Sequence, residues 1–198
     1  ISDLSPEELG QFATAWFPLP IERQRTIASN MVELAEENPE LDFSAIYKLC
    51  LKGDDEPLLE IVMDGLWEHE DRSVIPSLIE VLRSDKGSDV RAAAAAALGR
   101  FPLLAQEGKL LAKDGEVIHD NLMQVLEDEE EPLFVRRRCM EALAPFNTME
   151  INQRITLAYE SLDPDFRASS IFAMGRTGEA GWLPILLQEL QNEDPTIR

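Results

Sequence analysis

The chain has two histidines, and each stands beside an acidic residue, as His69–Glu70 and His119–Asp120. Imidazole and carboxylate groups are common protein ligands of iron and zinc. A di-metal centre needs several such pairs projecting from neighbouring helices into one space. Two pairs are too few for that geometry, so the sequence predicts no metal site and no cofactor.

Nucleophilic catalysis also lacks a recognisable motif. No GxSxG, HExxH, GxGxxG or phosphate-binding glycine-rich loop occurs in the chain. Cys50 and Cys139 each lie in an apolar pattern of helical spacing, without a base-bearing motif beside them, which predicts buried and reduced thiols. The acidic run EDEEE at 127–131 is typical of a solvated loop or helix end. We therefore expect a protein that is not an enzyme.

The charge of the chain limits the classes of partner that it can bind. There are 38 acidic and 18 basic residues, which gives a formal net charge of −20. Such a charge repels nucleic-acid phosphates and anionic lipid surfaces, so we expect neither nucleic acid nor membrane as a partner. No apolar run reaches the roughly 20 residues of a membrane span, and the first residues show no secretory signal. We predict a cytoplasmic protein with a solvated acidic surface, or one that meets a basic partner.

Arginine recurs at a fixed interval in similar segments. DVRAAAAAALGRF at 89–101, FVRRRCMEALAPF at 134–146 and DFRASSIFAMGRT at 165–177 share an apolar residue, an arginine, and small or apolar residues six to eight positions later. The step is 31 residues from Arg136 to Arg167, from Arg167 to Arg198, and from Glu60 of a weaker first copy to Arg91. A period of this length is the signature of a helical repeat protein. The anchor positions are Glu60, Arg91, Arg136, Arg167 and Arg198.

Each period predicts two helices. Helix A is exemplified by 73–85, 116–128 and 181–193, in which apolar residues recur with a period of 3.6. Helix B follows a turn and carries the anchor. Ser5 followed by Glu8 resembles a capping box at the start of a helix. Asp163 before Pro164 is also typical of a helix N-terminus, and we expect Gly175 and Gly178 to end that helix.

The spacing also predicts the organisation of the chain. Arg91 and Arg136 are 45 residues apart, 14 more than the period, which predicts an insertion at 101–116. Residues 1–54 are less regular and are predicted to form a diverged N-terminal cap, followed by repeats over 55–198. Because Arg198 stands one turn into a new helix B, and one turn is not stable by itself, we expect the array to be truncated at its C-terminus.

Small residues in helix B predict close helix packing. At three, six, seven and eight positions after the anchor, small residues let backbones approach, and one large apolar residue fills the gap. In the alanine-rich copy these positions hold Ala94, Ala97, Leu98 and Gly99. The exposed face is then expected to carry the other alanines, Ala92, Ala93 and Ala96.

The segments DVRAAAAAALGR, DFRASSIFAMGR and GWLPILLQEL resemble HEAT repeats, and they are most similar to the short HEAT-like repeats of phycobilin lyase subunits. The resemblance covers 55–198. It implies an all-α fold, a right-handed α-α superhelix built as a HEAT-like solenoid of helical hairpins. It also implies a ladder of arginines and aspartates, in which Arg136 would pair with nearby carboxylates. Some HEAT-like proteins are metalloenzymes, a class that the low histidine count disfavours.

In such a superhelix the B helices line the concave surface, so their exposed positions form columns across the repeats. Nine positions after the anchors, the column holds His69, Arg100, Pro145 and Arg176. We expect this column to form a positive strip with Arg137 and Arg138, beside an exposed Phe172 that would be an interaction hot spot. The alternative is that the arginines complement the dipoles of their own helices.

The resemblance and these columns together predict a function of binding rather than catalysis. We expect a protein–protein interaction scaffold that binds another protein through its concave face, with the insertion at 101–116 as a second contact. The alternative is a subunit of a phycobilin lyase or isomerase acting on phycobiliproteins, which would need a tetrapyrrole pocket.

Overall fold

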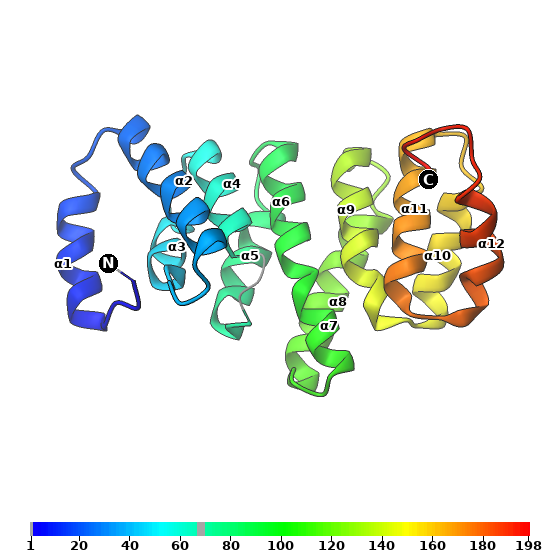
Figure 1. Cartoon of the computed structure of the whole chain (residues 1–198), viewed down its shortest axis with the longest axis horizontal. Helices are drawn as coiled ribbons and strands as arrows, with labels where there is room; N and C mark the ends of the chain where they lie inside the picture. Colours follow the sequence, from blue (N-terminus) through cyan, green and yellow to red (C-terminus); the bar gives the residue numbers. More distant parts are fainter. Residues whose placement is uncertain (1, 67–69) are drawn as a thin grey trace. The chain divides into compact units, whose positions relative to one another are not determined.

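The protein is built from helices (Figure 1). The computed structural model describes residues 2–66 and 70–198, and these residues contain no strand. The chain divides into two compact units, Ile1–Ala97 and Leu98–Arg198. The all-α class predicted from the sequence is confirmed. The first unit holds α1 (Pro6–Trp16), α2 (Ile21–Glu37), α3 (Ser44–Cys50), α4 (Glu56–Gly65), η1 (Arg72–Val74), α5 (Ile75–Leu82) and nearly all of α6 (Ser88–Leu98).

Two helices of the first unit, α1 and α4, begin at polar side chains that cap them. The Ser5 hydroxyl accepts the Glu8 N–H while the Glu8 carboxylate accepts the Ser5 N–H, which is the capping box that the sequence predicts. Asp55 caps α4 by accepting the Leu58 N–H at 3.0 Å. The same carboxylate accepts the Arg25 Nε–H at 2.8 Å, so α2 is tied to the start of α4.

The core of the first unit lies between α2, α3 and α4. Tyr47 is fully buried there, and the α4 backbone passes close to its ring. A Cβ added at Gly65 would lie 2.8 Å from the Tyr47 ring and 2.9 Å from Val32, so this close approach requires glycine. Other buried side chains of the same core are Met31, Ile46, Leu59, Val62 and Met63.

The second unit consists of packed helical hairpins. Helix α8 packs against α9, α10 packs against α11, and α9 and α11 lie side by side. Their contacts bury Ile118 and Leu122 of α8, Val135 and Met140 of α9, and Ile155 of α10. This unit contains α7 (Arg100–Gln106), α8 (Ala112–Glu127), α9 (Leu133–Leu143), η2 (Ala144–Phe146), α10 (Met149–Tyr159), α11 (Pro164–Thr177), η3 (Ala180–Trp182) and α12 (Leu183–Glu189).

The alanine-rich helix α6 is more buried than its pattern predicts. Ala94, Ala97, Leu98 and Gly99 are buried as expected. Ala92 is also buried, at 2% exposure, and Ala93 and Ala96 are half-buried, so the predicted exposed face was wrong. A run of alanines has no polar residues to mark which face of the helix is exposed. The sequence therefore could not identify the exposed face of α6.

One predicted helix end is corrected. Asp163 accepts the Phe166 N–H at 2.9 Å and starts α11 at Pro164, as predicted. Gly175, however, lies inside α11 and is exposed. The helix ends at Gly178, whose φ of 69° is the left-handed conformation that favours glycine after a helix.

The predicted insertion at 101–116 is largely helical. It contains most of α7, and α8 already begins at Ala112 rather than at residue 116. Between them the backbone turns at Gly108, with a φ of 71°, and the Lys109 N–H bonds the Leu104 carbonyl at 2.8 Å. The division into a cap at 1–54 and repeats at 55–198 stays a prediction.

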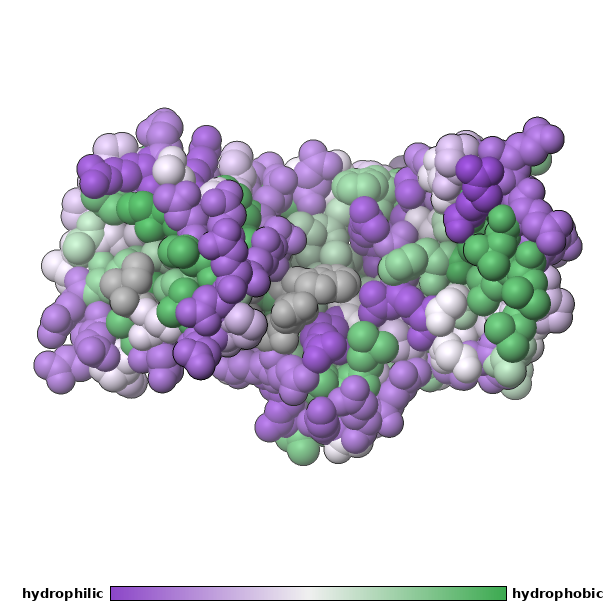
Figure 2. All heavy atoms as spheres, viewed as in Figure 1, coloured by the Kyte–Doolittle hydropathy of each residue, from purple (hydrophilic) through white to green (hydrophobic). Residues whose placement is uncertain are grey.

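Hydrophobic side chains gather on the outer face of α12. Figure 2 shows this hydrophobic surface at the right of the view. Leu183, Leu187 and Leu190 are 53%, 60% and 59% exposed. Among the described helices, none combines the length and the apolar character that crossing a membrane requires.

Candidate protein-interaction surface

Two anchor arginines bind the main chain of the preceding helix. The Nε–H of Arg91 donates to the Leu82 carbonyl at 2.9 Å, and that of Arg136 donates to the Leu126 carbonyl at 2.9 Å. Both carbonyls lie in the last turn of a helix, where they have no partner within the helix. The expected pairing of Arg136 with carboxylates was therefore wrong. Residue types do not mark free carbonyls, so the sequence did not show this acceptor.

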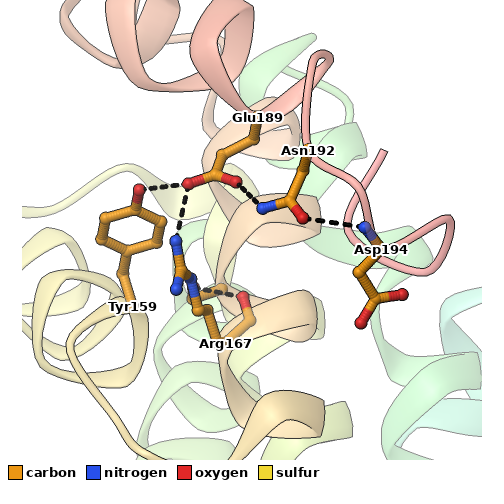
Figure 3. A network of polar contacts seen from close by, with 6 residues as sticks. Tyr159, Arg167, Glu189, Asn192 and Asp194 are labelled. Carbon is orange, nitrogen blue, oxygen red and sulfur yellow. Dashed lines mark hydrogen bonds and ion pairs between the residues drawn. The ribbon is translucent and has the colours of Figure 1, made fainter.

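The anchor Arg167 instead joins a polar network at the ends of two helices (Figure 3). Its guanidinium donates to the Glu189 carboxylate at 2.8 Å and lies over the Tyr159 ring, 4.9 Å from the centroid. The Tyr159 hydroxyl and the Asn192 amide also donate to this carboxylate. Hydrogen bonds from Tyr159 and Asn192, with the pairing to Arg167, lower the pKa of the buried Glu189 carboxyl. The network ties the ends of α10 and α12 to α11.

The remaining anchor positions differ in their surroundings. Glu60 is exposed on α4. Arg198 donates to the Asn192 carbonyl at 3.0 Å. Asp194 accepts the Thr196 N–H at 2.8 Å in a turn, so residues 194–198 do not form the start of the helix B expected at Arg198.

Three of the predicted site residues line one shallow pocket between α9 and α11. Arg137, Arg138 and Phe172 surround a cavity of about 200 Å³. Its other lining residues are Glu141, Ala168 and Ser169. These residues stand one, two and five positions after the anchors Arg136 and Arg167, so two consecutive repeats contribute equivalent positions. We call the surface formed by Arg137, Arg138, Glu141, Ser169, Phe172 and Arg176 the α9–α11 surface.

The two arginines of α9 are held by neighbouring side chains. Arg137 pairs with Asp165 at 3.0 Å and donates its Nε–H to the Ser169 hydroxyl at 2.9 Å, so its position is fixed across the two helices. Arg138 donates to Glu141 at 2.7 Å and lies over the Phe134 ring, 5.6 Å from the centroid. Each guanidinium keeps further N–H groups beyond these contacts.

Arg176 and Phe172 form the other side of the α9–α11 surface. The Arg176 guanidinium lies 5.7 Å from the centroid of the Phe172 ring and donates to the Gly99 carbonyl at 2.9 Å. Burial lowers the pKa of Arg176, and its Nε is buried without a hydrogen-bond partner among the described residues. Phe172 remains 53% exposed. The surface thus combines an accessible aromatic ring with three arginines.

Not all of the predicted positive strip belongs to this surface. Arg100 is half-buried at the start of α7 and does not line the pocket. His69 lies outside the described residues. Conversely, Phe134 and Asp165, which contact Arg138 and Arg137, were not predicted as site residues. Both stand two positions before their anchors, so this position could have been predicted to belong to the surface.

The two cysteines lie in the interior of the protein. Cys50 and Cys139 are buried and not in a disulfide, and burial raises the pKa of the Cys50 thiol to about 12. A thiol with that pKa is not a nucleophile at neutral pH. Within the described ranges, no three histidine, cysteine or acidic side chains are grouped so that they could hold a metal ion.

Comparisons with known proteins add one likeness. No family model matches the chain, and no curated protein matches it. Among solved structures, the chain is similar to a designed armadillo repeat protein in complex with the peptide (KR)4. The identity is 16%, the match covers 89% of this chain and 86% of that chain, and the TM-score is 0.47. The assignment of a fold of helical hairpins rests on the helices described above.

Proposed function

We propose that this chain is a non-catalytic scaffold that binds a segment of another protein on the α9–α11 surface. The observation that carries the proposal is the convergence of Arg137, Arg138 and Phe172 on one pocket between equivalent positions of two repeats. Repeat proteins present side chains in this way along neighbouring helices, and such arrays bind extended segments.

The composition of the surface supports binding to protein. Arginine and aromatic residues are enriched among the residues that dominate interface energies. Phe172 offers exposed apolar area, and the Arg176 guanidinium lies over its ring. Arg137 is already held by Asp165 and Ser169, so a partner would lose little free energy in ordering that side chain.

The size of the pocket favours a side chain over a free ligand. A cavity of about 200 Å³ is smaller than the roughly 300–1,000 Å³ typical of small-molecule sites. It is large enough for one side chain of a bound segment. The unused N–H groups of Arg137 and Arg138 suit a carboxylate of that segment, since arginine binds carboxylates in a planar, bidentate manner.

The experiment is site-specific photo-crosslinking in lysate of the source cells. Benzoylphenylalanine replaces Phe172, and the crosslinked proteins are identified by mass spectrometry together with the absorption spectrum of the eluate. The matched control places the same group at Leu157, which is 59% exposed on α10. We expect a specific crosslink from position 172 that Arg138→Gln reduces about tenfold, as for a hot-spot residue.

Two results would contradict the proposal. Equal crosslinking from positions 172 and 157 would mean that the surface has no preferred partner. A bilin absorbance in the eluate would instead favour the phycobilin lyase alternative and direct attention to a pigment pocket.

A further inference from the structure

A second and larger pocket lies at the turn between α7 and α8. It has a volume of about 550 Å³, within the range of small-molecule sites, which is also ample room for one long side chain. Leu110, Leu111 and Phe146 supply apolar walls, and Glu116, His119 and Asp120 supply polar groups. We call this the α7–α8 pocket. It shares no lining residue with the α9–α11 surface.

Helix α8 and the turn η2 build the pocket. Glu116, His119 and Asp120 are three and four positions apart on α8, so they share one face of the helix. Phe146 is brought opposite them by η2, and its ring meets the His119 ring edge-on, with centroids 5.6 Å apart. The Gln106 side chain donates to the Pro145 carbonyl, which joins α7 to η2 beside the pocket.

The polar groups of the pocket are hydrogen-bond acceptors. His119 Nδ1 lies 3.2 Å from the Asp120 carboxylate. When Nδ1 carries the proton and donates it to that carboxylate, Nε2 is left as an acceptor. Glu116 is exposed and forms no ion pair within the described residues. No lysine or arginine is among the described lining residues.

We propose that the α7–α8 pocket binds an arginine side chain of a partner protein. A guanidinium is planar, donates up to five hydrogen bonds and stacks on aromatic rings. The carboxylates of Glu116 and Asp120 would accept those bonds, and the guanidinium plane would stack on the Phe146 ring. The aliphatic part of the side chain would lie against Leu110 and Leu111.

Charge excludes the opposite class of ligand. A carboxylate or phosphate in this pocket would face Glu116 and Asp120 at close range, which is unfavourable. The formal net charge of −20 on the whole chain attracts cationic segments over longer distances. A neutral side chain would fill the apolar walls but would supply no positive charge to Glu116 and Asp120.

The test is an NMR titration with a defined peptide pair. The chain has two histidines, so His69→Gln leaves His119 as the one imidazole and assigns its ring signals. Acetyl-Leu-Arg-Leu-amide is compared with acetyl-Leu-citrulline-Leu-amide, which has the same shape without the charge. We expect a saturable shift of the His119 signals with the arginine peptide, and at least about tenfold weaker binding of the citrulline peptide.

Matched variants separate the pocket from general charge attraction. Asp120 is 79% exposed at its side chain, so Asp120→Asn leaves the fold intact and should weaken the arginine peptide about tenfold. Glu160→Gln removes an exposed carboxylate at the end of α10, away from the pocket lining, and should change nothing.

Three results would overturn the proposal: no shift of His119, equal binding of the citrulline peptide, or an equal loss in both variants. None of them bears on the α9–α11 surface, which is tested by crosslinking from position 172.

Discussion

The Nε–H of Arg136 donates a hydrogen bond to the main-chain carbonyl of Leu126, 2.9 Å away, and so joins the start of α9 to the last turn of α8. Arg91 makes the same contact to Leu82 between α6 and α5. In each case the positive charge lies at the negative end of a helix dipole. At these two anchor positions the recurring arginine therefore closes a helical hairpin, whereas Arg167 binds the Glu189 carboxylate instead.

Replacing Arg136 should destabilise the second unit. Arg136→Met keeps much of the side-chain volume but leaves the Leu126 carbonyl without its charged donor, which costs about 1.5–3 kcal/mol. Urea unfolding followed by circular dichroism measures the change. The control is Arg154→Gln, since Arg154 pairs with Glu127 on an exposed surface and such pairs contribute at most about 1 kcal/mol. Equal effects of the two substitutions would contradict the closing role of Arg136.

The unexpected burial of Ala92 gives a comparison between neighbours. Ala92→Leu places a larger side chain into a packed interface and should lower the free energy of unfolding by about 1–3 kcal/mol. Ala93→Leu, one residue along the same helix, falls on a half-buried position and should cost much less, since leucine and alanine have similar helix propensities. The measurement is thermal unfolding of the two variants, compared with the wild type. If both variants were neutral, the exposed face expected from the sequence would be correct after all.

The network around Glu189 should behave as a coupled unit. Glu189→Gln retains the shape of the side chain but removes the charge that Arg167 and Tyr159 contact, and should destabilise the protein by about 1–3 kcal/mol. Arg167→Met and the double variant complete a double-mutant cycle, in which we expect the two effects not to be additive. Glu193→Gln, an exposed change near the same helix end, serves as the control. Additive effects would show that the contacts in Figure 3 contribute independently.

Stability at acid pH should depend on Asp71. The hydrogen bond from Lys48 is the main cause that lowers the pKa of Asp71 to about 2. A carboxyl whose pKa is lowered in the folded state stabilises the protein above its unfolded pKa of about 4, and this contribution is lost as pH falls from about 4 to 2. The pair is partly exposed, so the contribution is at most about 1 kcal/mol.

The measurement for Asp71 is the free energy of unfolding between pH 2 and 6. Asp71→Asn should flatten the fall in stability between pH 4 and 2. Asp54→Asn, which alters a fully exposed carboxylate, should leave it unchanged. If the free energy of unfolding of Asp71→Asn fell between pH 4 and 2 as steeply as that of the wild type, Asp71 would not be responsible for the fall.

The features that the sequence predicted well are those that residue type and spacing define locally. Ser5 with Glu8 and Asp163 with Pro164 are chemical signals for a helix start, and both start helices at the expected places. The hydrophobic pattern of the helices A also predicted the buried positions Ile118 and Leu122. Such signals need no knowledge of the rest of the chain.

The features that the sequence missed depend on contacts between distant segments. The acceptor of Arg136 is a carbonyl, which every residue carries. The Arg176 guanidinium bonds the Gly99 carbonyl, 77 positions away, and no motif links the two. Counting positions from the anchors did predict that Arg137, Arg138 and Phe172 share one surface. Equivalent positions of consecutive repeats lie on neighbouring helices, which is why this count succeeded. Pairing within that surface depends on side-chain geometry that spacing does not define.

The bond from an anchor arginine to a main-chain carbonyl has a consequence for how this chain can diverge. A contact with the backbone makes no demand on the side chain that accompanies the carbonyl, so Leu82 and Leu126 are free to be selected for packing alone. It also tolerates changes of length, because Arg91 reaches back nine residues and Arg136 reaches back ten. Helices can therefore be lengthened or extra segments accepted, as before α8, while the closing bond of the hairpin is preserved. A designer who wished to add a repeat would need to keep the arginine and the helix end, and could vary the turn between them.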